Sequence, residues 1–342
     1  MKAMLLERLC NLDEVSQPLT MVELPSPVAA ESEVLVKVST CGVCHTELDE
    51  IEGRTPPPKL PVIPGHQVVG HVADVGRGVS RNRIGERVGI GWINSACGKC
   101  RACREGNENL CPGFKATGRD VDGGYAEYMT VPASFAYPIP ALFSDAEAAP
   151  LLCAGAIGFR SLRLTGLKDG ENLGLTGFGA SAHLVIKMVR YQYPHSKVFV
   201  FSRTPDEREF AEKLGAFWSG DIGDEPPEKL RAAIDTTPAW RPVTETLKHL
   251  EAGGRLVINA IRKEERDKES LLTLDYSRHL WMEKEIRSVA NITRADIREF
   301  LRVAAAIPIR PEVQEFGLDE ANEALRELKE RKIRGAKVLK VG

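Results

Sequence analysis

Four of the chain's eight cysteines lie close together in one pattern, Cys97-x2-Cys100-x2-Cys103-x7-Cys111. Four thiolates at such spacings suit a tetrahedral Zn²⁺ ion with no open coordination position. One alternative is an iron–sulfur cluster, because a ferredoxin pattern also ends in Cys-Pro, as this one does. The ferredoxin pattern places its last cysteine about four positions after the third, whereas the separation here is eight; unligated thiols are the other alternative. We therefore predict a structural zinc that fixes the loop of about residues 92–113.

The remaining composition is that of an ordinary globular protein. At 342 residues the chain is long enough for two domains of about 100–200 residues each. Its net charge of −2, with acids and bases interspersed, gives no sign of a nucleic-acid partner, and Glu105 and Glu108 lie among the bases of the cysteine segment. No apolar run approaches the roughly 20 residues that span a bilayer, and no signal peptide follows Met1. We expect a cytoplasmic protein with reduced cysteines, which favours metal binding over disulfides.

The hydrophobic pattern divides the chain into two kinds of structure. Strand-like runs at 34–38, 68–75 and 125–131, separated by Gly, Pro and Asn clusters, predict a β-rich region over the first 150 residues. From about Leu173 strands and helices alternate, which favours a doubly wound parallel sheet with helices on both faces. We expect strands of this sheet at 198–201, 232–236, 255–259 and 285–290. From about Asn291 the pattern is helix, strand, helix, strand.

A glycine turn follows the first strand of the alternating region, 172–176. Gly177-Phe178-Gly179-Ala180-Ser181-Ala182 is a G-x-G-x-x-A motif, and helical apolar spacing continues from it to Tyr191. In this strand–turn–helix setting Gly177, Gly179 and Ala182 let backbone N–H groups reach a dinucleotide pyrophosphate at the helix N-terminus.

The end of the next strand bears on which dinucleotide would bind. NAD sites place an acid there, about 20 residues beyond the glycines, to hold the ribose diol. Here the strand ends in Ser202 and Arg203, and Arg208 lies about one turn into the following helix. These donors favour NADP(H) over NAD(H); the alternative is that Arg203 pairs with Asp206 or Glu207. We predict that the helix begins with a capping box formed by Thr204 as N-cap and Glu207 three residues later. Pro205 would be its first residue, and Gly215 would mark its end.

Several further motifs resemble the zinc-containing alcohol dehydrogenases of the medium-chain dehydrogenase/reductase family, over nearly the whole chain. They are Cys41-Gly-Val-Cys-His-Thr46, Gly65-His66-Gln67-Val-Val-Gly70, the cysteine segment, Asp122-Gly-Gly-Tyr-Ala-Glu-Tyr128 and Ala149-Pro-Leu-Leu-Cys153-Ala-Gly. The resemblance implies an α/β protein with a β-rich GroES-like catalytic domain and a Rossmann-type domain. The catalytic domain would comprise residues 1–153 and 291–342, and the dinucleotide-binding domain residues 154–290.

Carried over residue by residue, the resemblance makes Cys44, His66 and Cys153 the ligands of a catalytic zinc, so that each chain would hold two zinc ions. Two thiolates and one imidazole leave the fourth coordination position free for water or an alcohol oxygen. Thr46 corresponds to the hydroxyl that takes the substrate proton, and His45 to the basic side chain that meets the cofactor pyrophosphate. We interpret Cys41 and Cys10 as ordinary thiols.

Other positions follow or depart from the family pattern. Glu47 stands where the family usually has an aspartate that orients the histidine ligand, and Trp92 matches a position that lines the substrate cleft. Gln67 replaces the usual glutamate beside the histidine ligand. Asp49 stands where many relatives have the histidine that ends the proton relay, which leaves the exit of the proton open. Ile157 replaces a threonine near the nicotinamide ring.

The function implied is hydride transfer between an alcohol or aldehyde and a nicotinamide cofactor. A polyol, formaldehyde or cinnamyl-type dehydrogenase on the same scaffold is an alternative, and the segment 53–58 lacks a bulky tryptophan found there in small-alcohol relatives. A non-catalytic, zinc-stabilised nucleotide-binding relative would be expected to have lost a ligand or Thr46, and neither is lost. The resemblance also implies a homodimer or homotetramer, with no nucleic-acid or membrane partner.

Overall fold

The computed structural model describes residues 1–330 and 335–342, which form two compact units. One unit combines Met1–Cys153 with Asn291–Gly342, and the other is Ala154–Ala290. No helix within the described ranges is long and apolar enough to cross a membrane.

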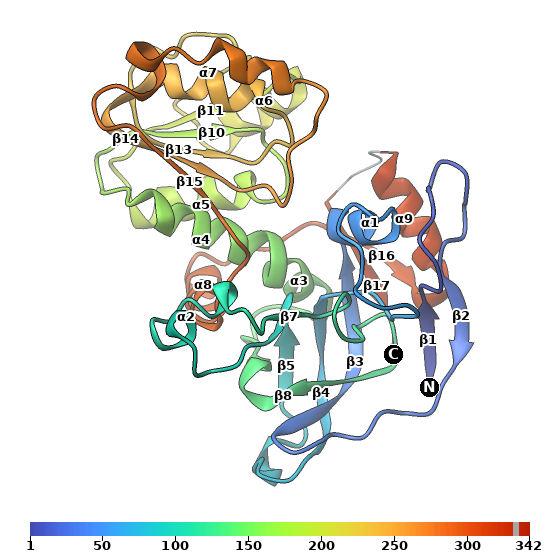
Figure 1. Cartoon of the computed structure of the whole chain (residues 1–342). Helices are drawn as coiled ribbons and strands as arrows, with labels where there is room; N and C mark the ends of the chain where they lie inside the picture. The colour runs from blue at the N-terminus through green and yellow to red at the C-terminus, as the bar shows by residue number, and fades with distance from the viewer. Residues whose placement is uncertain (331–334) are drawn as a thin grey trace. The chain divides into compact units, whose positions relative to one another are not determined.

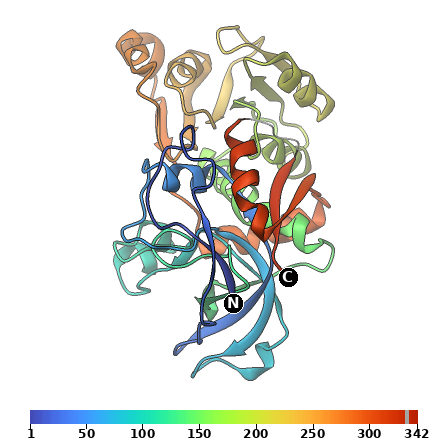
Figure 2. The same ribbon diagram turned by 90° about the vertical axis from the view of Figure 1, so that its right-hand side faces the viewer.

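Among the described residues, the first unit is built on a seven-stranded sheet in the order β16-β17-β3-β4-β5-β9, with β8 paired to β3. Only β16 and β17 pair in parallel; the other pairs are antiparallel. Figures 1 and 2 show the two long strands β3 and β4 side by side. The strands are β3 (Glu33–Val43), β4 (Gln67–Val75), β5 (Arg87–Ile90), β8 (Tyr128–Pro132), β9 (Tyr137–Pro138), β16 (Val313–Gly317) and β17 (Ala336–Lys340).

Shorter elements complete this unit. The strands β1 and β2 pair with each other, as do β6 and β7. These are β1 (Lys2–Leu5), β2 (Thr20–Glu23), β6 (Ile93–Ser95) and β7 (Lys115–Ala116). The helices are α1 (His45–Ile51), α2 (Arg101–Arg104), α3 (Asp145–Pro150), α8 (Arg294–Ala306) and α9 (Ala321–Lys329), with 3-10 turns at Arg81–Arg83, Glu108–Leu110, Ala133–Phe135 and Leu318–Glu320.

The strand β3 shows why the sequence forms this sheet. Val34, Val36 and Val38 alternate with more exposed residues and are buried on one face, as a half-buried strand requires. The predicted strands 34–38 and 68–75 are confirmed. The prediction for 125–131 was wrong at its start, because β8 begins at Tyr128. Tyr125 is fully buried. Its backbone N–H donates to the carbonyl oxygen of Pro64, and its own carbonyl oxygen accepts the N–H of Met4.

Among the described residues, the second unit holds six parallel strands in the order β12-β11-β10-β13-β14-β15. In Figure 1 helices α6 and α7 lie on one side of this sheet, and α4 and α5 on the other. The strands are β10 (Leu173–Thr176), β11 (Val198–Phe201), β12 (Trp218–Gly220), β13 (Leu230–Asp235), β14 (Leu250–Ile258) and β15 (Glu285–Ser288). The helices are α4 (Ala156–Thr165), α5 (Ala182–Gln192), α6 (Pro205–Lys213) and α7 (Arg241–His249), with short helical turns at Lys268–Thr273 and Tyr276–Leu280.

This arrangement is the doubly wound fold that the alternating pattern predicts. The chain builds the sheet outward from β10 in one direction and then from β13 in the other. The strand order therefore reverses between β10 and β13, and in such sheets ligands bind beyond the carboxyl ends of the strands at the reversal. The predicted tail is also confirmed, as α8, β16, α9 and β17.

The predicted capping box of α6 was wrong, although the start of the helix was right. Thr204 is the N-cap, in an extended conformation, and Pro205 is the first helical residue. The side chain of Thr204 makes no capping hydrogen bond. The carboxylate of Glu207 instead accepts a hydrogen bond from the hydroxyl of Ser202, which in turn accepts one from the backbone N–H of Thr204 at 3.4 Å. The helix ends at Lys213, and Gly215 follows with a φ of +94°.

Candidate functional site

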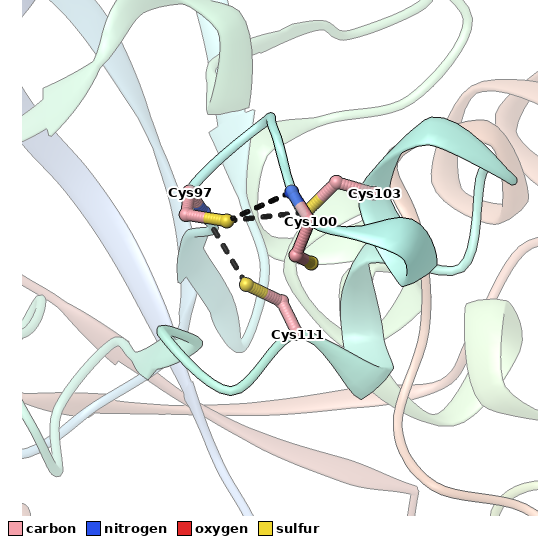
Figure 3. Close-up of side chains that lie close together, drawn as sticks. All are labelled: Cys97, Cys100, Cys103 and Cys111. Atoms are coloured by element: carbon pink, nitrogen blue, oxygen red, sulfur yellow. Dashed lines mark hydrogen bonds between the residues drawn. The ribbon is translucent and has the colours of Figure 1, made fainter.

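The four cysteines of the predicted structural site converge in space, as Figure 3 shows. All four sulfur atoms, of Cys97, Cys100, Cys103 and Cys111, lie within 4.8 Å of one another. Backbone N–H groups of Cys100 and Cys97 donate to the sulfurs of Cys97 and Cys111, each at 3.4 Å. Such donors stabilise negative charge on sulfur. The donor set therefore fits a tetrahedral cation of the zinc type.

The titration of these thiols agrees with a shared cationic centre. Backbone N–H groups of Lys99 and Cys100 lower the pKa of Cys97 to about 6. Desolvation and the neighbouring thiols raise the pKa of Cys103 to about 12. The four sulfurs are so close that one thiolate opposes the ionisation of the next. A divalent cation among them would remove that repulsion.

A buried carboxylate ties the cysteine segment to the last part of the chain. Glu108, which lies between Cys103 and Cys111, is only 4% exposed. Its Oε1 accepts hydrogen bonds from the backbone N–H and the Nε of Arg294, at 3.0 and 2.9 Å. Arg294 begins α8 and also lies over the ring of Phe135, 4.9 Å from its centroid. The sequence analysis counted Glu108 only among the charges of the cysteine segment, because nothing local indicates a partner 186 positions away.

A second cluster joins Cys44, His66 and Cys153 from three separate parts of the first unit. The Nε2 of His66 lies 3.6 Å from the sulfur of Cys44 and 3.4 Å from that of Cys153. All three potential ligand atoms lie within 4.8 Å of one another. Cys44 caps α1 directly after β3, and His66 directly precedes β4. Cys153 lies in a single π-helical turn, Leu151–Gly155, a distortion frequent at functional sites.

Glu47 holds two of these three residues in place. It is fully buried, and its Oε1 lies 2.5 Å from the Nδ1 of His66. Its Oε2 accepts the backbone N–H of Cys44 at 2.9 Å, which closes a capping box at the start of α1. A carboxylate on one ring nitrogen fixes the tautomer and directs the other nitrogen to the sulfurs. The arrangement leaves Nε2 available as a metal ligand.

The electrostatics of this cluster also suit a cation. The hydrogen bond to Cys153, burial and the charge of Glu47 all raise the pKa of Cys44 well above its ordinary value. Burial lowers the pKa of His66, but Glu47 and Cys44 raise it more, and the net direction is upward. Two sulfurs and a carboxylate thus compete for positive charge in a buried space. Two thiolates and one imidazole match a zinc site with an open position.

The remaining predicted residues of α1 lie around this cluster. The backbone N–H of Thr46 donates to the sulfur of Cys44 at 3.4 Å, and its side chain is partly buried. His45 is exposed at the first position of the helix. Asp49 forms an ion pair with the Nε of Arg54.

Gln67, Trp92 and one unanticipated acid complete the surroundings. Gln67 is buried beside Gly42, where an added Cβ would lie 2.6 Å from its Oε1. The ring of Trp92 packs against that of Phe114, 5.4 Å between centroids. Glu50 is 2% exposed, and burial followed by the charge of Glu47 raises its pKa well above the ordinary value. The three-residue spacing from Glu47 on α1 is the sequence signal that could have identified it.

The glycine motif lies at the carboxyl end of β10, as expected. Gly177 has a φ of +77°, and an added Cβ would lie 2.9 Å from the Oγ1 of Thr236. At Gly179 an added Cβ would meet no heavy atom of the described chain within 4 Å. Gly177 is therefore required by packing, whereas Gly179 leaves open space beside the turn. Ala182 is buried at the start of α5, whose first N–H groups face this turn.

At the end of β11, Ser202 is engaged on both sides. Its hydroxyl donates to Glu207, and its carbonyl oxygen accepts from the guanidinium of Arg208 at 2.7 Å. Arg203 is exposed and makes no ion pair within the described residues. The alternative pairing of Arg203 with Asp206 or Glu207 is therefore not formed. The carboxylate of Glu207 thus lies at the end of β11, although we had predicted it as part of the capping box of α6.

Comparison with known proteins agrees with this geometry. Residues 30–141 match the alcohol dehydrogenase GroES-like domain. A probable alcohol dehydrogenase of Mycobacterium tuberculosis is 45% identical, over 94% of this chain and 92% of that protein. An alcohol dehydrogenase of Geobacillus stearothermophilus is 33% identical, over 96% of this chain and 98% of that protein.

The fold is likewise shared with a solved structure. A cinnamyl alcohol dehydrogenase from Sorghum bicolor superposes with a TM-score of 0.83 at 25% identity, covering 99% of this chain and 97% of that one. Similarity of this extent in both sequence and fold covers both units of the chain. The chain therefore belongs to the zinc-containing alcohol dehydrogenases of the medium-chain dehydrogenase/reductase family and is an oxidoreductase of that family.

Proposed function

We propose that the chain is a zinc-dependent dehydrogenase that transfers a hydride between an alcohol or aldehyde and a nicotinamide dinucleotide, with NADP(H) favoured. One observation carries the proposal: the ligand atoms of Cys44, His66 and Cys153 converge within 4.8 Å of one another. Three protein ligands with a fourth position open is the pattern of catalytic zinc, whereas structural sites are closed.

Each group of ligands would have its own function. Cys44, His66 and Cys153 would hold the catalytic ion, and Glu47 would orient the imidazole through its Nδ1. Bound zinc acts as a Lewis acid that stabilises negative charge on a substrate oxygen. The four-cysteine cluster would hold a second ion that fixes its loop, which gives two zinc ions per chain.

Within this site the chain's own residues would handle the proton. The hydroxyl of Thr46, which follows Cys44 by two positions in the first turn of α1, would accept the proton of a substrate alcohol. Asp49, which forms an ion pair with Arg54, is the weaker candidate for the terminal acceptor. His45, exposed beside them, would present a basic side chain to the cofactor pyrophosphate.

The proposed cofactor site is the crevice beyond the carboxyl ends of the parallel strands. Gly177, Gly179 and Ala182 would let the backbone approach the pyrophosphate at the N-terminus of α5. The preference for NADP(H) rests on Arg203, whose guanidinium is exposed and unpaired within the described residues. Ser202 and Arg208 would add donors, although both are engaged with their neighbours at present. The negative charge of Glu207 at the end of β11 would instead disfavour the additional phosphate of NADP(H).

The substrate class has a second candidate. The structural similarity to a cinnamyl alcohol dehydrogenase favours an aromatic or other bulky alcohol over a small one. Trp92, packed against Phe114, would line the substrate cleft. A polyol or formaldehyde dehydrogenase remains an alternative on the same scaffold, and a homodimer or homotetramer is the expected assembly.

The test is a screen of alcohols and aldehydes with both cofactors, on the wild type and two variants. We expect turnover by the wild type and none by Cys44→Ser. Cys10→Ser is the matched control, because Cys10 is a thiol of the same unit outside both clusters. It should keep full activity. A folded, zinc-loaded wild type that binds a dinucleotide but turns over no alcohol or aldehyde would instead identify the non-catalytic alternative.

A further inference from the structure

The second unit contains a buried ion pair that the proposed chemistry does not use. Asp235 is the last residue of β13 and is fully buried. The side chain of Lys263, in the segment after β14, is 9% exposed and forms an ion pair with Oδ2 of Asp235. The same ammonium group donates to the carbonyl oxygens of Thr237 and Ala239, at 2.8 and 2.9 Å. All three of its hydrogens are therefore used within the protein.

The other carboxylate oxygen of Asp235 binds the same loop. Oδ1 accepts the backbone N–H of Thr237 at 3.1 Å and its hydroxyl at 2.7 Å. Both members of the ion pair, Asp235 and Lys263, therefore form hydrogen bonds with the loop of residues 236–239. A buried ion pair contributes little net stability, since the cost of desolvating two charges offsets their attraction. Its effect here is to select one conformation of this loop.

That loop packs directly against the glycine turn. The backbone N–H of Thr236 donates to the carbonyl oxygen of Thr176, the last residue of β10, at 2.9 Å. A Cβ at Gly177 would lie 2.9 Å from both the Oγ1 of Thr236 and the Cγ2 of Thr237. The contact lies between β10 and β13, where the strand order reverses and ligands bind in sheets of this kind.

We propose that Asp235 and Lys263 are positioning residues that hold residues 236–239 as one wall of the dinucleotide crevice, beside the turn at Gly177. The wall is formed before the dinucleotide arrives, so its ordering does not reduce affinity. This inference rests on the proposed function, because it concerns the affinity of the same crevice for a nicotinamide dinucleotide.

A separate set of hydrogen bonds holds the start of α7. The carboxylate of Asp267 accepts the backbone N–H groups of Trp240 and Arg241, at 2.9 and 2.8 Å. The loss of Lys263 would therefore release the loop without detaching the helix. The effect should appear as weaker cofactor binding and not as general loss of structure.

The test measures the dissociation constants of NADH and NADPH by fluorescence titration for the wild type and Lys263→Met. If the loop then keeps its binding conformation about one tenth of the time, the dissociation constant for the preferred dinucleotide rises about tenfold. kcat at saturating cofactor and the zinc content should change less than about twofold. Lys284→Met is the matched control, because Lys284 also donates to two carbonyl oxygens, those of Leu247 and Arg278, at the opposite end of the sheet. It should leave both dissociation constants unchanged.

A second variant keeps the test decisive if Lys263→Met leaves a buried, unpaired Asp235 and does not fold. Asp235→Asn/Lys263→Met leaves no buried charge at this site, yet it lacks the hydrogen bonds from the ammonium group to the loop. It should show the same rise in the dissociation constant. A folded double variant with wild-type affinity would overturn the inference while leaving the proposed function intact. If the wild type binds neither dinucleotide, the proposed function itself fails, and with it this inference.

Discussion

The carboxylate of Glu47 lies 2.5 Å from the Nδ1 of His66 and also accepts the backbone N–H of Cys44 at 2.9 Å. One buried side chain thus orients two of the three residues proposed to bind the catalytic zinc. The sequence suggested only the first contact, by its position in the family pattern, and the longer side chain of glutamate reaches both partners.

Removing this carboxylate should weaken the metal site. We expect Glu47→Gln, which keeps the shape but not the charge, to reduce zinc affinity about 10–100-fold, the usual effect of losing such a partner. Competition with a chelator, followed by metal analysis, measures the change. Glu105→Gln is a control, since Glu105 makes a surface ion pair with Arg101. Equal zinc affinity in both variants would show that Glu47 only packs beside His66.

The hydroxyl of Thr46 should be needed for turnover and not for structure. Thr46→Val keeps the shape of the side chain and removes the hydroxyl, so we expect kcat to fall about 10²–10⁴-fold, the usual worth of a positioned acid or base. Zinc content and thermal midpoint should stay near the wild-type values. Thr46→Ser should recover most of the activity. Turnover by the valine variant within about threefold of wild type would assign the proton to another group.

His249 should make the second unit sensitive to acid. Burial, followed by the charge of Lys229, lowers the pKa of His249 to about 4, and its ring stacks on Phe201 at 5.7 Å. In the unfolded chain the pKa of His249 is near 6.5, so on acidification the unfolded state binds the proton first. The contribution of the neutral ring to folding stability is therefore fully present above about pH 6.5 and is lost as the pH falls toward 4. The loss should be about 1–3 kcal/mol, since one unit of difference in pKa between the two states corresponds to about 1.4 kcal/mol.

Denaturant unfolding at pH 7 and pH 4.5 measures this effect. His249→Leu should lose less stability on acidification than the wild type does. His195→Leu serves as the control, because His195 is exposed and Asp169 raises its pKa. Identical acid sensitivity in the wild type and His249→Leu would mean that other groups account for the loss.

Local pattern predicted the elements well, and distant contacts account for what it missed. β11 was predicted with its observed limits because four apolar residues stand between clear turn signals. The side chain of Glu207 accepts a hydrogen bond from the hydroxyl of Ser202 and not, as the sequence had predicted, from the backbone of the helix cap. Lys263 meets Asp235 across 28 positions, between loops that only the folded sheet brings together.

Arg203 decides the expected cofactor preference. Hydrogen bonds to a charged group contribute about 1.5–3 kcal/mol, and each 1.4 kcal/mol is a tenfold change in affinity. Arg203→Ala should therefore lower the preference for NADPH about 10–100-fold, as the ratio of kcat/KM values for the two cofactors. Glu207→Gln should raise that preference, because it removes a negative charge from the strand end. A wild type that prefers NADH would show that Glu207 and not Arg203 controls this end of the strand.

The number and separability of the zinc ions test the account most directly. Elemental analysis of the purified wild type should give about two zinc ions per chain, and Cys44→Ser should retain about one, stay folded and lose activity. Cys100→Ser should instead lower the thermal midpoint, because a structural zinc contributes to the free energy of folding. A wild-type content near one zinc ion per chain, or the presence of iron, would contradict the assignment of the two clusters.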